Sequence, residues 1–132
     1  MKSADELIDL YSKELEQDTD IDILDVLDKQ RRLPNIRHKW QFRLMNAKRD
    51  LLKLEEAEKD FLNKVLSDCP VDLSKAKAAK KAENDSNYRV LQTSIKEYLI
   101  LIEYLEVAVN KNLYQMGYDI KNLIDLMKFE QL

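Results

Sequence analysis

Eight lysines and arginines crowd into one short stretch of this sequence, between Arg31 and Lys53. Only one acid, Asp50, lies among them, whereas residues 1–30 hold ten Asp and Glu against three Lys. The two stretches carry local charges of +7 and −7, although the whole chain nets only −3. A dense basic stripe of this kind is typical of a surface that contacts the phosphates of a nucleic acid. The affinity of such a surface comes mainly from counterions that the nucleic acid releases.

The sequence contains few residues that could form a catalytic or metal-binding site. His38 is the sole histidine, so one chain cannot build a multi-histidine metal site. Cys69 is the sole cysteine, which rules out an intrachain disulfide and fits a reducing compartment. A nucleophilic pair of these two residues is disfavoured, because His38 lies in the basic stretch and Cys69 precedes a proline. Neither glycine-rich nucleotide motif occurs. We therefore expect no enzyme, no metal and no cofactor.

The elements that carry the basic residues are expected to be helices. One glycine and two prolines leave little material for tight turns, and Leu, Lys, Glu and Ala all favour helix. The expected fold class is all-α, with two long helices plus short N- and C-terminal helices. At 132 residues we expect a single helical domain. Its parts are acidic N-terminal helices and a long basic helix in 1–66, a polar linker in 67–87, and oligomerisation helices in 88–132.

A short first helix should begin at Ser3, because Ser3 and Glu6 form a capping-box pattern ahead of apolar residues. It should end near residue 16, before a break at residues 18–20. A second helical stretch should stop before Pro34, which disfavours helix at the preceding residue and suits the first turn of a new helix.

The long basic helix is predicted over residues 34–66. Its apolar residues alternate spacings of four and three, the period of a packing seam, with Glu58 at one position of the series. They are Trp40, Leu44, Ala47, Leu51, Leu54, Phe61 and Val65. A helical wheel turns five basic residues away from this seam: Lys39, Arg43, Arg49, Lys53 and Lys64. Separate packing and binding faces are therefore predicted. The candidate DNA contacts are Arg37, Lys39, Arg43, Lys48, Arg49, Lys53 and Lys64, with auxiliary contacts from Lys75, Lys77, Lys80 and Lys81.

Two interpretations of the basic stripe stay open at this stage. The stripe can bind nucleic acid, or it can pair with acids of a neighbouring helix, for which residues 1–30 are suited. Trp40 is likewise either a stacking platform for bases or a core residue, and its seam position favours the core. The rival to a DNA-binding protein is a helical oligomeric adaptor or scaffold that touches no DNA.

A second long helix is predicted from Tyr88 to Met116, with Gly117 supplying a left-handed C-terminal residue and a last helix at about 119–129. Residues 98–109 are apolar on several sides, which is more than a chain of this size is expected to cover. They are too few to span a bilayer, so we expect a soluble protein. Self-association should bury the remainder. The candidate interface residues are Tyr98, Leu99, Ile102, Leu105, Val109 and Leu113.

Two stretches carry a resemblance to a known family. They are Lys39-Trp40 followed by KRDLLKLEEAEKDFL at residues 48–62, and GYDIKNLIDLMKFE at residues 117–130. The sequence resembles the UvsY recombination mediator family of T-even-type tailed phages. One departure concerns a Lys-x-Arg-Leu element that the family's basic helix can carry. Residues 63–66 here read Asn-Lys-Val-Leu, so only the leucine is kept in place.

The resemblance implies a definite function. Such proteins bind single-stranded DNA, the phage RecA-like recombinase and the phage single-strand-binding protein. They load the recombinase onto strands that the single-strand-binding protein covers, and they have no catalytic activity of their own. They form ring-like homo-oligomers, hexamers or heptamers, through their C-terminal helices. The implied location is the cytoplasm of the infected bacterial host.

Overall fold

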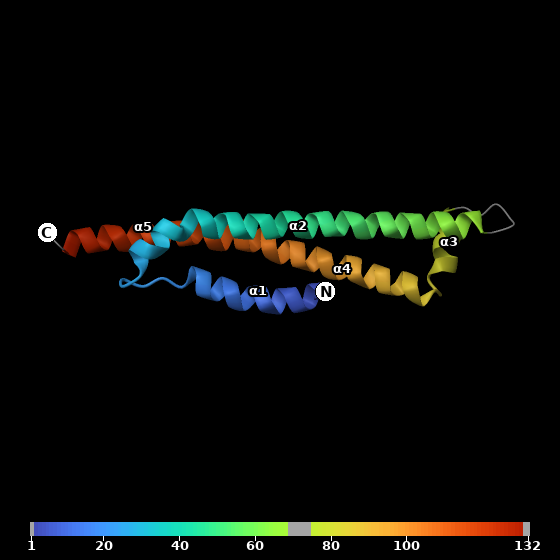
Figure 1. Ribbon diagram of the computed structural model, residues 1–132, viewed down its shortest axis with the longest axis horizontal. Helices are drawn as coiled ribbons and strands as arrows, with labels where there is room; N and C mark the ends of the chain where they lie inside the picture. The colour runs from blue at the N-terminus through green and yellow to red at the C-terminus, as the bar shows by residue number, and fades with distance from the viewer. Residues whose placement is uncertain (1, 69–74, 131–132) are drawn as a thin grey trace.

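The computed structural model describes residues 2–68 and 75–130, and helices account for nearly all of them (Figure 1). In chain order, the described elements are α1 (Ala4–Thr19), α2 (Val26–Ser67), α3 (Lys75–Ala82), α4 (Ser86–Val107), the π-helical turn η1 (Ala108–Asn112) and α5 (Leu113–Glu130). The predicted all-α class is confirmed.

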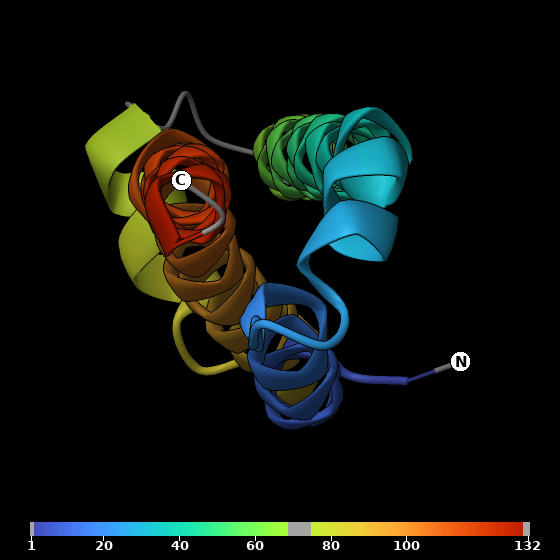
Figure 2. The same cartoon turned by 90° about the vertical axis from the view of Figure 1, so that its left-hand side faces the viewer.

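The molecule is an elongated hairpin of helices with one added helix. α2 runs almost its whole length, and α4, η1 and α5 return antiparallel to it as one rod (Figure 1). α1 lies alongside α4, and an end-on view places α1, α2 and the α4–α5 rod at the corners of a triangle (Figure 2). α1 therefore lies nearer to α4 than to α2, and side chains must fill the space between α1 and α2.

The first helix begins as predicted and ends later than predicted. The Ser3 hydroxyl accepts a hydrogen bond from the Glu6 backbone N–H at 3.2 Å, which caps the start of α1. The helix continues to Thr19, so the break expected at residues 18–20 is wrong for its first two residues. Lys29 of α2 donates to the Gln17 carbonyl at 2.9 Å. This bond satisfies one of the carbonyls that a helix end leaves unpaired, and it explains why α1 holds its last turn.

Pro34 does not start a new helix. α2 is continuous from Val26, with Pro34 in its interior, so the expected boundary is wrong. The first turns of α2 are inclined to the rest of the helix (Figure 1), which is the usual result of a proline that lacks an N–H and crowds the preceding turn. Leu33 and Ile36 are both buried beside Pro34. Tertiary packing therefore holds the helix together across the proline.

Gly117 does not end a helix either. It lies inside α5 without a positive φ, and the rod continues through η1 from α4. The predicted end at Met116 is therefore wrong. A Cβ at position 117 would lie 2.6 Å from Nη2 of Arg37 and 3.9 Å from Leu33. The glycine thus leaves room for the Arg37 side chain of α2 to lie against α5.

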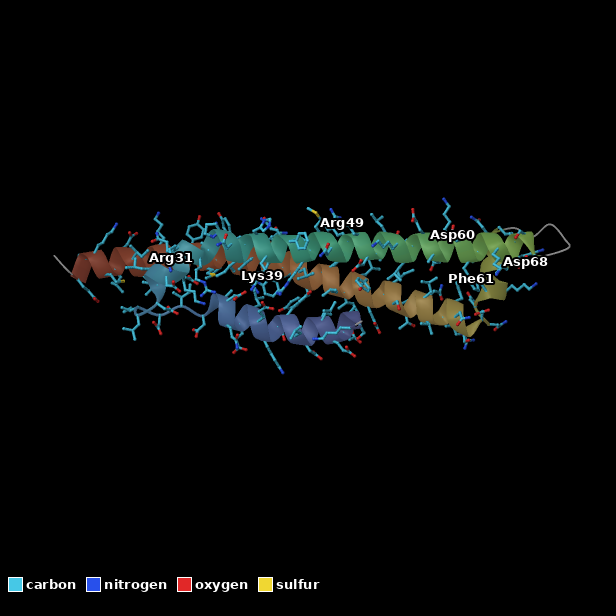
Figure 3. All side chains as sticks on the ribbon, viewed as in Figure 1. Arg31, Lys39, Arg49, Asp60, Phe61 and Asp68 are labelled. Carbon is cyan, nitrogen blue, oxygen red and sulfur yellow. The ribbon has the colours of Figure 1, made fainter. Side chains whose placement is uncertain are left out.

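The predicted seam of α2 forms the core. Trp40 is fully buried and Ala47 is almost so, while Leu44, Leu51 and Leu54 pack against the core cluster. At the far end, Phe61 stacks on Tyr88 with 5.4 Å between the ring centres (Figure 3). Asp85 caps α4 there by accepting from the Asn87 N–H at 2.8 Å. Apolar packing therefore extends along the hairpin from Trp40 to Phe61.

The single chain covers more of the second long helix than predicted. Four of the six candidate interface residues lie in the chain's own core: Tyr98, Ile102, Leu105 and Leu113. The expectation that one chain cannot cover them is wrong, because α1 and α2 pack over this side of α4. Val109 is partly buried and Leu99 is half exposed. The large apolar side chains exposed on α4 are Val90, Leu99, Ile100 and Val107.

The predicted linker at 67–87 contains α3 and the first residues of α4. Cys69 lies outside the described residues, so the structure does not bear on its pairing with His38. Within residues 2–68 and 75–130, no helix is long and apolar enough to cross a membrane.

Candidate nucleic-acid interface

Two of the predicted DNA contacts, Lys39 and Arg43, face α1 instead of solvent. Nζ of Lys39 lies 2.8 Å from Oε1 of Glu14 and 2.6 Å from Oδ2 of Asp18. Nη1 of Arg43 lies 2.8 Å from Oε2 of Glu14. We call these four residues the α1–α2 ion cluster. The prediction of a basic face wholly separate from the packing face is wrong here, because α1 approaches this side of α2 (Figure 3).

Aromatic rings complete the ion cluster. The guanidinium carbon of Arg43 lies 4.4 Å from the ring centre of Tyr11 and 4.7 Å from that of Trp40. The two rings meet edge to face, with 5.6 Å between their centres. The core position predicted for Trp40 is confirmed, and its indole is not available to stack on bases.

The charges of this cluster perturb one another. Hydrogen bonding from Arg43 lowers the pKa of the Glu14 carboxyl below its ordinary value of 4.5. Burial opposes this lowering, and the hydrogen bond from Lys39 and the charges of both cations add to it. The cations stabilise the ionised carboxylate because the site is partly shielded from water. A DNA phosphate must therefore displace a carboxylate before it can contact Lys39 or Arg43.

Arg37 is also drawn inward. Its side chain is partly buried and lies across Gly117 of α5. This position suits helix packing better than contact with a strand.

The other four predicted contacts remain at the surface. Lys48, Arg49, Lys53 and Lys64 are all exposed on α2. Nζ of Lys48 lies 3.5 Å from Oε1 of Glu106, but both side chains are about half exposed, so the pair is weak. Arg49 has no ion pair in the described part of the chain, and it lies on the edge of α2 that faces away from α1 (Figure 3). These cations are open to a polyanion.

Asp50, the only acid of the basic stretch, is turned toward the interior. Together with Lys53 and Tyr98, it lines a cavity of about 400 Å³ between α1, α2 and α4. Burial and the neighbouring Asp50 carboxylate raise the pKa of the Tyr98 hydroxyl. As a result, none of the exposed residues between 34 and 53 of α2 is acidic.

Sequence reasoning missed an apolar component of this surface. Five exposed residues repeat the four-three spacing on the side of α2 opposite the seam, and we call them the outer face of α2: His38, Phe42, Met45, Arg49 and Leu52. The signal was present in the sequence, since Phe42 lies outside the seam among basic residues. The inner seam alone accounts for the helical pattern, so spacing does not single out the second stripe.

The auxiliary lysines lie on the short helix α3. Lys77, Lys80 and Lys81 are exposed there, whereas the side chain of Lys75 lies outside the described residues.

The fold matches one that is already known. No protein-family model matches the chain, and no curated protein matches it. Among solved structures, the chain is similar to the crystal structure of the bacteriophage T4 recombination mediator protein UvsY, with a TM-score of 0.78. The match covers 98% of this chain and 99% of that chain, at 22% sequence identity. The chain has a UvsY-like fold. The resemblance seen in residues 39–62 and 117–130 is thus confirmed at the level of the fold.

Proposed function

We propose that this chain is a recombination mediator that binds single-stranded DNA and loads a RecA-like recombinase onto strands covered by single-strand-binding protein. The observation that carries the proposal is the occurrence of exposed cations on α2 of a UvsY-like fold. The protein acts without catalysis. The free energy for displacing the single-strand-binding protein comes from binding, and the recombinase supplies any nucleotide hydrolysis.

The proposed strand contacts are Lys48, Arg49, Lys53 and Lys64. Each provides a charge for a phosphate, and such contacts position a strand without reading its sequence. Lys39 and Arg43 leave the set of direct contacts, because Glu14 and Asp18 already neutralise them. Their role in the free protein is to fasten α1 to α2.

One chain offers only a few phosphate contacts, so tight binding of a strand requires several copies of the chain. A ring of subunits raises the effective concentration of weak contacts along one strand, so the assembly binds much more tightly than a monomer. We propose a ring-like homo-oligomer, a hexamer or heptamer, whose contacts include the exposed side of α4 at Leu99, Ile100 and Val107. Apolar residues exposed on one helix are suited to such contacts.

A helical adaptor without DNA binding is the second candidate. The α1–α2 ion cluster favours it, since there the basic stripe serves intramolecular pairing. The adaptor needs no open cations, however, and the outer part of α2 retains them.

Salt-dependent binding separates the two candidates. The variant Lys48→Ala/Arg49→Ala/Lys53→Ala and a matched variant, Lys13→Ala/Lys121→Ala/Lys128→Ala, lose the same charge from exposed positions on different helices. Binding of a labelled single-stranded oligonucleotide is measured from low to moderate salt. The log–log slope should flatten by about 0.7 per lost phosphate contact in the first variant only. Recombinase loading on covered strands should fall in parallel. Failure of the unmodified protein to bind the oligonucleotide would favour the adaptor, and equal slopes in all three proteins would exclude these cations as the strand contacts.

A further inference from the structure

Phe42 is an aromatic side chain that lies outside the buried core. It is 50% exposed, on the side of α2 opposite the buried seam. Within the described residues, no other ring contacts it, whereas Phe61 and Trp40 both have aromatic partners. Met45 and Leu52 are exposed on the same face, by 52% and 62%. The core therefore gains little from this phenyl ring.

The part of α2 around Phe42 is cationic, and none of its exposed residues between 34 and 53 is acidic. Arg49 follows Phe42 on the same face two turns later, and Lys48 and Lys53 flank that face. Asp50 is turned away toward Tyr98. The outer face extends over about 21 Å of helix, at 1.5 Å per residue. It thus offers the apolar groups Phe42 and Met45 in its N-terminal half and positive charge in its C-terminal half.

A single nucleic-acid strand has the complementary arrangement. Its phosphates are anionic, and its unpaired bases present apolar faces that stack on aromatic side chains whatever their sequence. An apolar protein surface would match Phe42 and Met45 but would leave the cations beside them without partners. Charge therefore favours the strand over a second protein as the occupant of this face.

We propose that Phe42 stacks on a base of a bound single strand, while Lys48, Arg49 and Lys53 contact phosphates of the nucleotides that lie toward the C-terminal end of α2. This assignment rests on the proposed function and specifies how the strand lies along α2. It makes Phe42 a binding residue that acts through bases, distinct from the cations that act through phosphates.

The test compares a base-bearing strand with a base-free one. The ligands are a thymidine oligonucleotide and an abasic phosphodiester strand of equal length, and the protein variants are Phe42→Leu and Phe42→Trp. Phe42→Leu should weaken binding of the base-bearing strand about 5- to 150-fold, the range of one aromatic stack, with an unchanged salt slope. Its affinity for the abasic strand should stay as in the unmodified protein. Phe42→Trp should bind the base-bearing strand at least as well, and the introduced indole should be quenched by it.

The matched control is Phe129→Leu, which removes an exposed phenyl ring near the end of α5 and should alter neither affinity. If Phe42→Leu binds both strands like the unmodified protein, stacking is refuted while the proposed function stands. If Phe42→Leu instead lowers the oligomer mass or recombinase binding without changing DNA affinity, the face contacts protein and the proposal is equally wrong. If the unmodified protein binds neither strand, the proposed function and the stacking both fail.

Discussion

The indole N–H of Trp40 donates a hydrogen bond to Oδ2 of Asp18 at 2.9 Å, and this bond joins the long helix α2 to α1. Trp40 is fully buried and Asp18 nearly so. Lys39 reaches the same carboxylate oxygen at 2.6 Å. One acid of the N-terminal region thus satisfies a core donor and neutralises a cation of the basic stripe. Helix packing and charge in the basic stripe are therefore coupled at this residue.

Replacing Asp18 should reveal that coupling. Asp18→Ala leaves the Trp40 N–H without its acceptor in a buried place, so the free energy of unfolding should fall by about 1–3 kcal/mol. Asp18→Asn is the matched variant, because an amide oxygen can still accept from Trp40 while the charge pair with Lys39 is lost. Its destabilisation should be smaller. Chemical denaturation measures both, and equal stability of Asp18→Ala and the unmodified protein would contradict the structure.

The fluorescence of Trp40 supplies an independent prediction. Because the indole is buried against Tyr11 and Arg43, its emission should be blue-shifted and should change little when single-stranded DNA is added. An exposed, red-shifted spectrum with strong quenching by an oligonucleotide would move Trp40 from the core to the strand.

Stability in acid should depend on Glu14. The folded protein holds the pKa of this carboxyl below 4.5, so folding favours the ionised form. Its contribution is present above the pKa of the unfolded chain and is lost as the pH falls through the lowered folded value, that is, below about pH 4.5. Glu14→Gln should therefore lose less stability than the unmodified protein across that window. Glu16→Gln, an exposed position of the same helix, should behave like the unmodified protein in denaturation at pH 3, 4, 5 and 7.

The sequence predicted the parts of this fold that depend on periodicity. The seam through Trp40, Ala47 and Leu54 follows from four-three spacing, and the start of α1 follows from the Ser3 cap. Local rules failed where tertiary contacts override them. Pro34 sits within α2 because Leu33 and Ile36 pack on both sides of it, and such packing cannot be read from the dipeptide alone.

The sequence predicted which basic residues make up the candidate site, but not which of them pair with α1 and which stay open to solvent. The basic stripe was expected either to bind nucleic acid or to pair with acids of a neighbouring helix. Each interpretation describes part of the stripe, because Lys39 and Arg43 pair with α1 whereas Lys48 and Arg49 stay open to solvent. The boundary between them depends on where α1 lies across α2. That position is set by side chains such as Trp40 that fill the space between the helices, and no spacing rule specifies it.

Gly117 offers a test of the corrected helix. Glycine inside a helix costs about 0.5–1 kcal/mol relative to alanine. A Cβ at this position would meet only the flexible end of Arg37 at close range. Gly117→Ala should therefore stabilise the fold by up to about 1 kcal/mol in thermal or chemical unfolding, after Arg37 moves aside. A left-handed glycine at a helix end would give the opposite result, a clear loss of stability.

Two charged substitutions on α4 should separate folding from assembly. Leu105 is fully buried in the chain's own core, so Leu105→Asp should unfold the protein, with loss of helical circular dichroism. Ile100 is 56% exposed on the same helix. Ile100→Asp should keep the helicity and lower the mass of the assembly in sedimentation, because it places a charge in the proposed intersubunit contact. An unchanged mass for Ile100→Asp would remove this side of α4 from the interface.

The carboxylates of α1 should compete with DNA for the cations of α2. Glu14 pairs with both Arg43 and Lys39, so Glu14→Gln frees the arginine and weakens the hold on the lysine. Single-stranded DNA should then bind more tightly, and its log–log salt slope should steepen by about 0.7 for each phosphate that reaches a released cation. Glu16→Gln changes the net charge equally on the same helix, but it releases no partner among the described residues, so its slope should not change. Identical slopes for the two variants would show that Arg43 and Lys39 stay inside the fold, held by Asp18 and the rings of Tyr11 and Trp40, and that the strand contacts only the outer part of α2.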